Sequence, residues 1–122
     1  MSTSSTIRAV RVHRPGGPEA MGIDDLPLPA PGPGQARVRL EFAGVNFIDV
    51  YHRSGAYPLP TPFVPGSEGA GVVDAVGAGV AEPRVGDRVA WAMQPGSYAE
   101  CAVFDARTLV PDRKSTRLNS SH

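Results

Sequence analysis

The chain has 122 residues, about one domain's worth, and 41% of them are hydrophobic, so it can bury a core. Twelve basic residues balance twelve acidic ones, which excludes the strong positive field expected of a protein that binds nucleic acid or an anionic membrane. No apolar run is long enough to span a bilayer, and Cys101 is the single cysteine, so we expect a cytoplasmic protein without a disulfide or a cysteine-rich zinc lobe.

The two ends of the chain differ from the rest of it. Residues 1–6 are nearly all Ser and Thr and lack the features of a secretory signal, which predicts a disordered N-terminus. All 14 glycines and all 13 prolines precede residue 112, whereas the one lysine, Lys114, follows it. Residues 112–122 also resemble a translated sequencing adapter, so we expect an artefactual tail rather than a natural basic C-terminus. Residues 7–111 are left as the domain.

Frequent glycine and proline predict short strands separated by turns, in a mostly β barrel or sandwich. Residues 7–12 predict a first strand. Alternate prolines over residues 26–34 forbid a helix and predict an extended connector; a proline-rich ligand for a partner is the less favoured alternative. Further strands are predicted at residues 71–77, 87–91 and 97–104, and another is predicted to start at 108–110.

Residues 36–42 form the clearest strand pattern. Val38, Leu40 and Phe42 alternate with charged residues and are predicted to share one buried face of an antiparallel sheet. Residues 46–54 predict a short helix that Gly55 ends. Within that helix Asp49 and Arg53 are four residues apart, so we expect them to pair across one turn.

A glycine-rich string at residues 77–82 partly matches the phosphate-binding pattern G-x-G-x-x-G. Glu82 stands where the third glycine belongs, and an acidic side chain there would repel a phosphate. No helix pattern follows the string, so it predicts a turn between two strands.

Few residues could bind a metal. His13, His52 and Cys101 have no ligand spacing to one another, so each His is predicted to play a structural or surface role. Glu68 is predicted to accept a hydrogen bond from the backbone or to pair with an arginine rather than to bind a metal. The expectation is a protein without zinc.

Three motifs follow one another along residues 7–111, each occurring once. They are Gly44-Val45-Asn46-Phe47-Ile48-Asp49 with Tyr51, then Pro65-Gly66-Ser67-Glu68-Gly69-Ala70-Gly71, then Val85-Gly86-Asp87-Arg88-Val89. In this order and spacing they resemble the N-terminal part of the medium-chain dehydrogenase/reductase superfamily. The zinc enzymes of that superfamily have Cys in place of Asn46 and His in place of Ser67, so the chain resembles the zinc-free quinone oxidoreductase branch instead.

The resemblance implies a fold and a cofactor. The fold would be a GroES-like, partly open β-barrel with short helices, and the nucleotide-binding Rossmann domain that follows it in the family is absent from this chain. The cofactor would be NADPH, with Phe47, Ile48, Asp49 and Tyr51 in contact with it. The full-length enzyme would be a homodimer.

The resemblance also implies catalytic and substrate-binding residues. We expect Asn46 and Tyr51 to donate hydrogen bonds to the substrate oxygen and Asp49 to orient them, although Tyr51 needs an irregular turn to join the other two. Tyr57 would form an aromatic wall for a planar quinone. Without the motif match, Asn46 would be interpreted as a helix cap and Tyr51 as ordinary packing.

Three functions are compatible with the sequence. The first is the N-terminal fragment of an NADPH-dependent quinone or enone oxidoreductase that transfers hydride to a conjugated carbonyl. The second is an enoyl reductase module of a polyketide synthase. The third is a stand-alone, non-catalytic GroES-like scaffold domain. On the first interpretation the fragment itself is expected to be inactive and poorly stable, because its sheet edges and apolar surface are left open.

Overall fold

The computed structural model describes residues 6–56 and 59–111. Their regular structure is mostly β, as predicted. In chain order the elements are β1 (Thr6–Val12), η1 (Pro18–Ala20), β2 (Met21–Pro27), β3 (Gln35–Ala43), α1 (Phe47–Ser54), β4 (Glu68–Val76), β5 (Arg88–Ala92), β6 (Cys101–Asp105), η2 (Ala106–Thr108) and β7 (Val110–Pro111). None of the described helices is long and apolar enough to cross a membrane.

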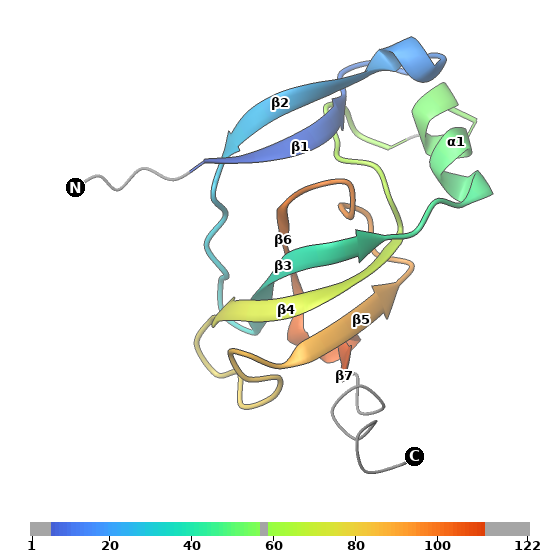
Figure 1. The fold of residues 1–122 in the computed structure, drawn as a ribbon. Helices are drawn as coiled ribbons and strands as arrows, with labels where there is room; N and C mark the ends of the chain where they lie inside the picture. Colours follow the sequence, from blue (N-terminus) through green and yellow to red (C-terminus); the bar gives the residue numbers. More distant parts are fainter. Residues whose placement is uncertain (1–5, 57–58, 112–122) are drawn as a thin grey trace.

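The strands form two antiparallel sheets. β1 pairs with β2, and a five-stranded sheet runs in the order β6-β3-β4-β5-β7. Single bridges from Ala9 to Ala99 and from Val12 to Phe63 tie β1 to segments that flank the larger sheet. Figure 1 shows the β1–β2 ribbon lying apart from the curved larger sheet, with α1 beyond the end of β3. This arrangement agrees with the predicted, partly open barrel.

The core lies within the five-stranded sheet. Its buried members are Ala36, Val38, Val73, Val89, Trp91, Phe104, Ala106 and Leu109. The Trp91 and Phe104 rings pack at 4.6 Å between centroids. β3 contributes two of these residues and pairs on both sides, with β4 and β6, so its alternating pattern is that of a central strand.

The prediction for Phe42 is wrong. Val38 is fully buried and Leu40 is partly buried, but 72% of Phe42 is exposed. The register explains the difference, because Leu40 lies opposite Gly71 and Phe42 lies opposite Ala70, which leaves one extra residue on β3. Such a bulge shifts the alternation of side chains, so the strand turns Phe42 outward.

Three other expectations need correction. Thr6 begins β1, so the disordered N-terminus predicted for residues 1–6 does not include it; residues 1–5 lie outside the described part of the chain. Residues 21–27 form β2, a strand that was not predicted from the sequence, and its last two residues overlap the predicted connector at 26–34; Pro27 is tolerated as the last residue of an edge strand. Regular β structure in the predicted strand 97–104 begins only at Cys101.

The glycine-rich string at residues 77–82 is a turn between β4 and β5, as predicted. Gly77 donates its backbone N–H to the Gln35 carbonyl at 2.8 Å. A side chain at Gly77 would collide with the Gly32 carbonyl, so the close approach of two backbones explains this glycine. Phosphate binding is not needed to account for it.

Candidate functional site

Helix α1 follows β3 after the short connection 44–46 and is fixed at both ends. Asn46 is its N-cap residue, with an extended backbone (φ −133°, ψ 160°), and Gly55 ends it in the left-handed region at φ 91°. The predicted helix and its stop are therefore confirmed. The predicted Asp49–Arg53 pair is wrong, because the Arg53 Nε donates to the Gly16 carbonyl at 3.2 Å and Asp49 has other partners.

Asp49 is the buried acid of the site, with only 5% of its surface exposed. Its Oδ2 accepts a hydrogen bond from the Asn46 backbone N–H at 2.9 Å, as in a capping box. The same oxygen accepts a second bond from the Tyr98 hydroxyl at 3.0 Å. Within the described residues Oδ1 is buried and accepts no hydrogen bond. Asp49 is thus linked both to its own helix and to a segment 49 residues away.

Asn46 is held from the sheet side by Glu68, the first residue of β4. The Asn46 Nδ2 donates to the Glu68 Oε2 at 3.0 Å, and the Gly44 N–H donates to the Glu68 carbonyl at 3.0 Å. A Cβ on Gly44 would lie 2.5 Å from the Glu68 Cγ, so only glycine leaves room for this carboxylate. The expected partners of Glu68, backbone or arginine, were wrong, because its side chain binds the amide of Asn46.

The structure brings Asn46 and Asp49 together but does not place Tyr51 with them. Residues 47–54 form a continuous α-helix, without the irregular turn that would carry Tyr51 to the side of Asn46. Tyr51 is 43% exposed and Phe47 is 83% exposed, while Ile48 is partly buried. Tyr57, expected to line the substrate site, lies outside the described residues.

Tyr98 is a site residue that the sequence did not indicate. It precedes β6 in an irregular segment, and no local pattern connects it with a helix 49 residues earlier. The pKa of Tyr98 is raised to about 12. Burial of the phenol is the largest cause, and the hydrogen bond to Asp49 and the negative charge of that residue add to it. The phenol is protonated at neutral pH, as an unperturbed tyrosine is, and the raised pKa keeps it a donor into the alkaline range.

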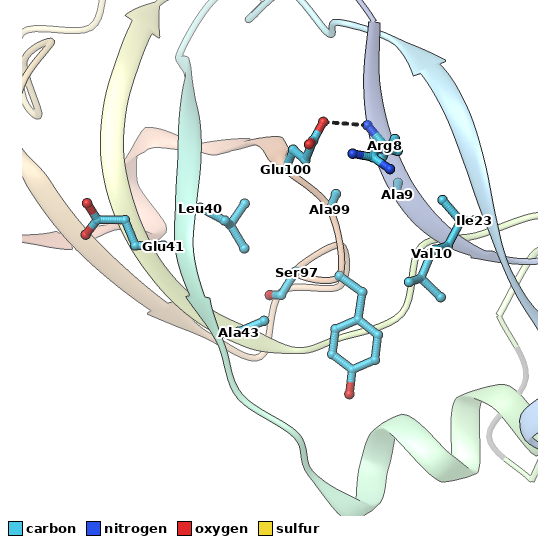
Figure 2. Close-up of a pocket in the computed structure, with 11 residues that line it drawn as sticks. Arg8, Ala9, Val10, Ile23, Leu40, Glu41, Ala43, Ser97, Ala99 and Glu100 are labelled. Carbon is cyan, nitrogen blue, oxygen red and sulfur yellow. Dashed lines mark hydrogen bonds between the residues drawn. The ribbon is translucent and has the colours of Figure 1, made fainter.

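A cavity of about 420 Å³ borders Tyr98 between β1, β3 and residues 97–100. Figure 2 shows Val10 and Leu40 pointing into it from β1 and β3, with Ala43 and Ala99 at its edges. At one end the Arg8 backbone N–H donates to Glu100 Oε1 at 2.7 Å. Most of its lining is apolar, and Arg8, Glu41 and Glu100 are its charged members.

Metal-ligating side chains do not gather in the part of the chain that the structure describes. No group of three or more His, Cys, Asp or Glu residues there could hold an ion. His13 bonds to the Asp24 carboxylate at 2.6 Å, in agreement with a structural role. Cys101 is buried, and desolvation is the main reason that the pKa of its thiol is raised.

The chain is similar to known proteins over most of its length. The alcohol dehydrogenase GroES-like domain model matches residues 32–114. The quinone oxidoreductase of Pseudomonas aeruginosa is 50% identical over 97 residues, which are 78% of this chain and 30% of that protein. The 2-haloacrylate reductase of a Burkholderia species is 38% identical over 121 residues, or 95% of this chain and 36% of the relative.

Solved structures give the same result. The Escherichia coli quinone oxidoreductase in complex with NADPH superposes with a TM-score of 0.82 at 35% identity, over 85% of this chain and 32% of that one. A mycobacterial quinone oxidoreductase has a TM-score of 0.79 at 45% identity, over 84% and 32%. The chain spans about a third of the length of these relatives. It belongs to the alcohol dehydrogenase GroES-like family, in the quinone oxidoreductase branch of the medium-chain dehydrogenase/reductases.

Proposed function

We propose that this domain is the N-terminal, catalytic part of an NADPH-dependent oxidoreductase that transfers hydride to a quinone or enone without zinc. The observation that carries the proposal is the fixed amide of Asn46 at the start of α1, bonded to Glu68 at 3.0 Å. In the zinc enzymes of the superfamily a metal ligand stands at that position. The resemblance also leads us to expect a cytoplasmic homodimer.

Negative charge builds on the substrate oxygen as a conjugated carbonyl is reduced, and hydrogen-bond donors can stabilise that charge. An amide nitrogen carries two N–H groups, and the Glu68 contact uses one of those of Asn46, so the second remains to donate to the substrate. Asp49 fixes the Asn46 backbone through the bond at 2.9 Å. Tyr51, a residue that is 43% exposed, is proposed as a second donor, and reaching the oxygen bonded to Asn46 would need α1 to shift when substrate binds.

The residues at the amino end of α1 suit one side of a nicotinamide site. Phe47 offers a large exposed apolar face, with the partly buried Ile48 beside it. Asp49 has a carboxylate oxygen that accepts no hydrogen bond within the described residues. These three residues, with Tyr51, would contact NADPH, which supplies the hydride when bound. Its main binding site is proposed to lie in a following nucleotide-binding domain.

The donor set argues against a catalytic zinc. At the two positions where the zinc enzymes have Cys and His, this chain has Asn46 and the buried Ser67. Glu68 is the nearby carboxylate, and it is already bonded to the Asn46 amide. Catalytic zinc is usually held by three protein ligands that include His or Cys, so the chemistry at this position depends on neutral donors.

The conjugated class of substrate has a second line of support. The Burkholderia relative is named for the reduction of a 2-haloacrylate, a compound whose double bond is conjugated to a carboxylate. The Pseudomonas, Escherichia and mycobacterial relatives are quinone oxidoreductases. A quinone and an activated alkene both place the charge on a conjugated oxygen, so one set of donors serves both. Comparing quinones with enoyl thioesters would separate this enzyme from a polyketide enoyl reductase.

The test is kinetic and uses the full-length protein that carries this domain. NADPH oxidation is followed with a quinone and with an enone, for the wild type and for Tyr51→Phe and Asn46→Ala. We expect Tyr51→Phe to lower kcat several-fold and Asn46→Ala to lower it by about tenfold, because each removes a donor. Val85→Ala, at an exposed turn between β4 and β5, is the control and should keep the wild-type rate.

Three results would count against the proposal. An unchanged rate for Tyr51→Phe would remove that residue from the mechanism. If the wild-type protein fails to oxidise NADPH in the presence of either the quinone or the enone, the scaffold interpretation is favoured. Purification with stoichiometric zinc, together with loss of turnover on chelation and recovery on its return, would show that a metal polarises the carbonyl.

A further inference from the structure

Tyr98 is fixed in place by segments other than α1. Its backbone N–H donates to the Pro65 carbonyl at 3.0 Å, and its carbonyl accepts from the Val10 N–H at 2.8 Å. These partners lie 33 residues and 88 residues before it in the chain. The backbone of Tyr98 is therefore anchored between β1 and the segment before β4.

The ring of Tyr98 packs against Gly66, where a side chain would leave it no room. A Cβ on Gly66 would lie 2.6 Å from the Tyr98 Cδ1, and Gly66 has φ +99°, a conformation that other residues rarely adopt. The neighbouring Ser97 is fully buried, and its Oγ accepts a hydrogen bond from the Trp91 indole at 3.0 Å. The two backbone hydrogen bonds of Tyr98 and its contact with Gly66, rather than the Ser97 hydroxyl, set the position of the phenol independently of the helix.

The Tyr98 phenol contacts the site through a single oxygen atom, the Oδ2 of Asp49. Tyr98 donates to the Asp49 Oδ2 at 3.0 Å, and that same oxygen accepts the Asn46 backbone N–H at 2.9 Å. A carboxylate in this environment can rotate unless a second donor holds it, and Oδ1 accepts no bond within the described residues. Tyr98 is the donor that connects the Asp49 side chain to the segment before β6, alongside the bond from Asn46 to Glu68.

We propose that Tyr98 is a positioning residue, which fixes the Asp49 carboxylate and, through it, the backbone of Asn46. The inference rests on the proposed function, because it concerns the same donor group. It assigns no contact between Tyr98 and the substrate. Its consequence is that removing one hydroxyl, 49 residues away in sequence, misplaces the amide that stabilises the substrate oxygen.

The kinetic test compares Tyr98→Phe with Ser97→Ala in the full-length protein. Tyr98→Phe keeps the ring against Gly66 and removes only the hydroxyl, whereas Ser97→Ala removes a neighbouring hydrogen bond that does not touch the site. We expect Tyr98→Phe to lower kcat for a quinone by about tenfold, with little change in KM, and Ser97→Ala to lower the thermal midpoint without changing kcat. In an Asp49→Asn background the tenfold effect should shrink to less than about threefold, because the two groups act together.

A second measurement does not need activity. Hydrogen exchange of the Asn46 backbone amide, followed by NMR, should accelerate about tenfold in Tyr98→Phe and stay unchanged in Ser97→Ala. If the wild type reduces quinones but Tyr98→Phe keeps its kcat, or if the effect persists in full with Asp49→Asn, the positioning role is wrong. A wild type that reduces no quinone overturns only the proposed function, and unchanged Asn46 exchange in Tyr98→Phe would then overturn this inference separately.

Discussion

The side-chain amide of Asn46 lies 3.0 Å from the carboxylate of Glu68, across 22 residues of sequence. This contact joins the first residue of β4 to the N-cap of α1. The bond to a charged acceptor is stronger than one between neutral groups, so it holds the amide in one orientation. An amide fixed in this way can donate without reorganising when charge develops on a substrate.

Replacing Asn46 by Asp would place two carboxylates side by side. Like charges at this distance raise the pKa of one of them in the folded state above its unfolded value. The stability that depends on this site is then present at acid pH and lost as the pH rises through the raised value. We expect Asn46→Asp to melt at a lower temperature near pH 8 than near pH 5, relative to the wild type.

The double variant Asn46→Asp/Glu68→Gln is the matched control. It exchanges the carboxylate and the amide and restores one donor and one acceptor, so its melting temperature should follow the pH profile of the wild type. Equal melting of Asn46→Asp at the two pH values would show that these side chains do not meet.

Two glycines in strands offer a test of packing. A Cβ on Gly71 would come 2.9 Å from the carbonyl carbon of Arg39, whereas nothing lies within 4 Å of one on Gly22. Gly71→Ala should reduce the free energy of unfolding by about 1–3 kcal/mol, because the β3–β4 pair must separate to admit the methyl group. Gly22→Ala, on β2, should change it by no more than about 0.5 kcal/mol. Denaturant titration of both variants makes the comparison, and equal effects would contradict the β3–β4 register.

The aromatic pair in the core should dominate the stability of the domain. Phe104 is buried and packs on Trp91 at 4.6 Å between ring centroids. Phe104→Ala should cost about 3–5 kcal/mol, while Val110→Ala at an exposed position should cost less than about 0.5 kcal/mol. Trp91 is the only tryptophan, so its fluorescence in a denaturant titration reports both. A Phe104→Ala variant as stable as the wild type would place this ring outside the core.

The titration of Tyr98 should make the stability of the domain depend on pH in the alkaline range. Its pKa is raised from 10.0 to about 12 in the folded state, chiefly by burial and then by Asp49. The stability that it contributes is therefore fully present below pH 10 and is lost as the pH rises through about 12. NMR titration of ring-labelled tyrosine should show this shift, and Asp49→Asn should move the pKa back toward 10.0. Tyr98→Phe identifies the resonance, and titration of the wild-type residue near 10.0 would contradict both the burial of the phenol and its hydrogen bond to Asp49.

Parts of the site could be read from the chain and parts could not. Asn46, Asp49 and Gly55 form a cap, a third-position acid and a stop, and such signals act within one or two turns. Their placement on one helix was therefore predictable. Tyr98 and Glu68 reach the helix from 49 and 22 residues away, and no local spacing encodes those contacts.

Local features were predictable from the chain: the alternation that makes residues 36–40 a half-buried strand, the α1 helix with its ends, and the motif order of the family. Three features depend on contacts between distant segments: the outward position of Phe42, the pairing of residues 21–27 with β1, and the bonds from Tyr98 to Asp49 and between Asn46 and Glu68. The two sets differ in the distance along the chain over which the interactions act. Backbone preference and periodicity act over a few residues, whereas bulges, strand partners and buried hydrogen bonds depend on how distant segments come into register.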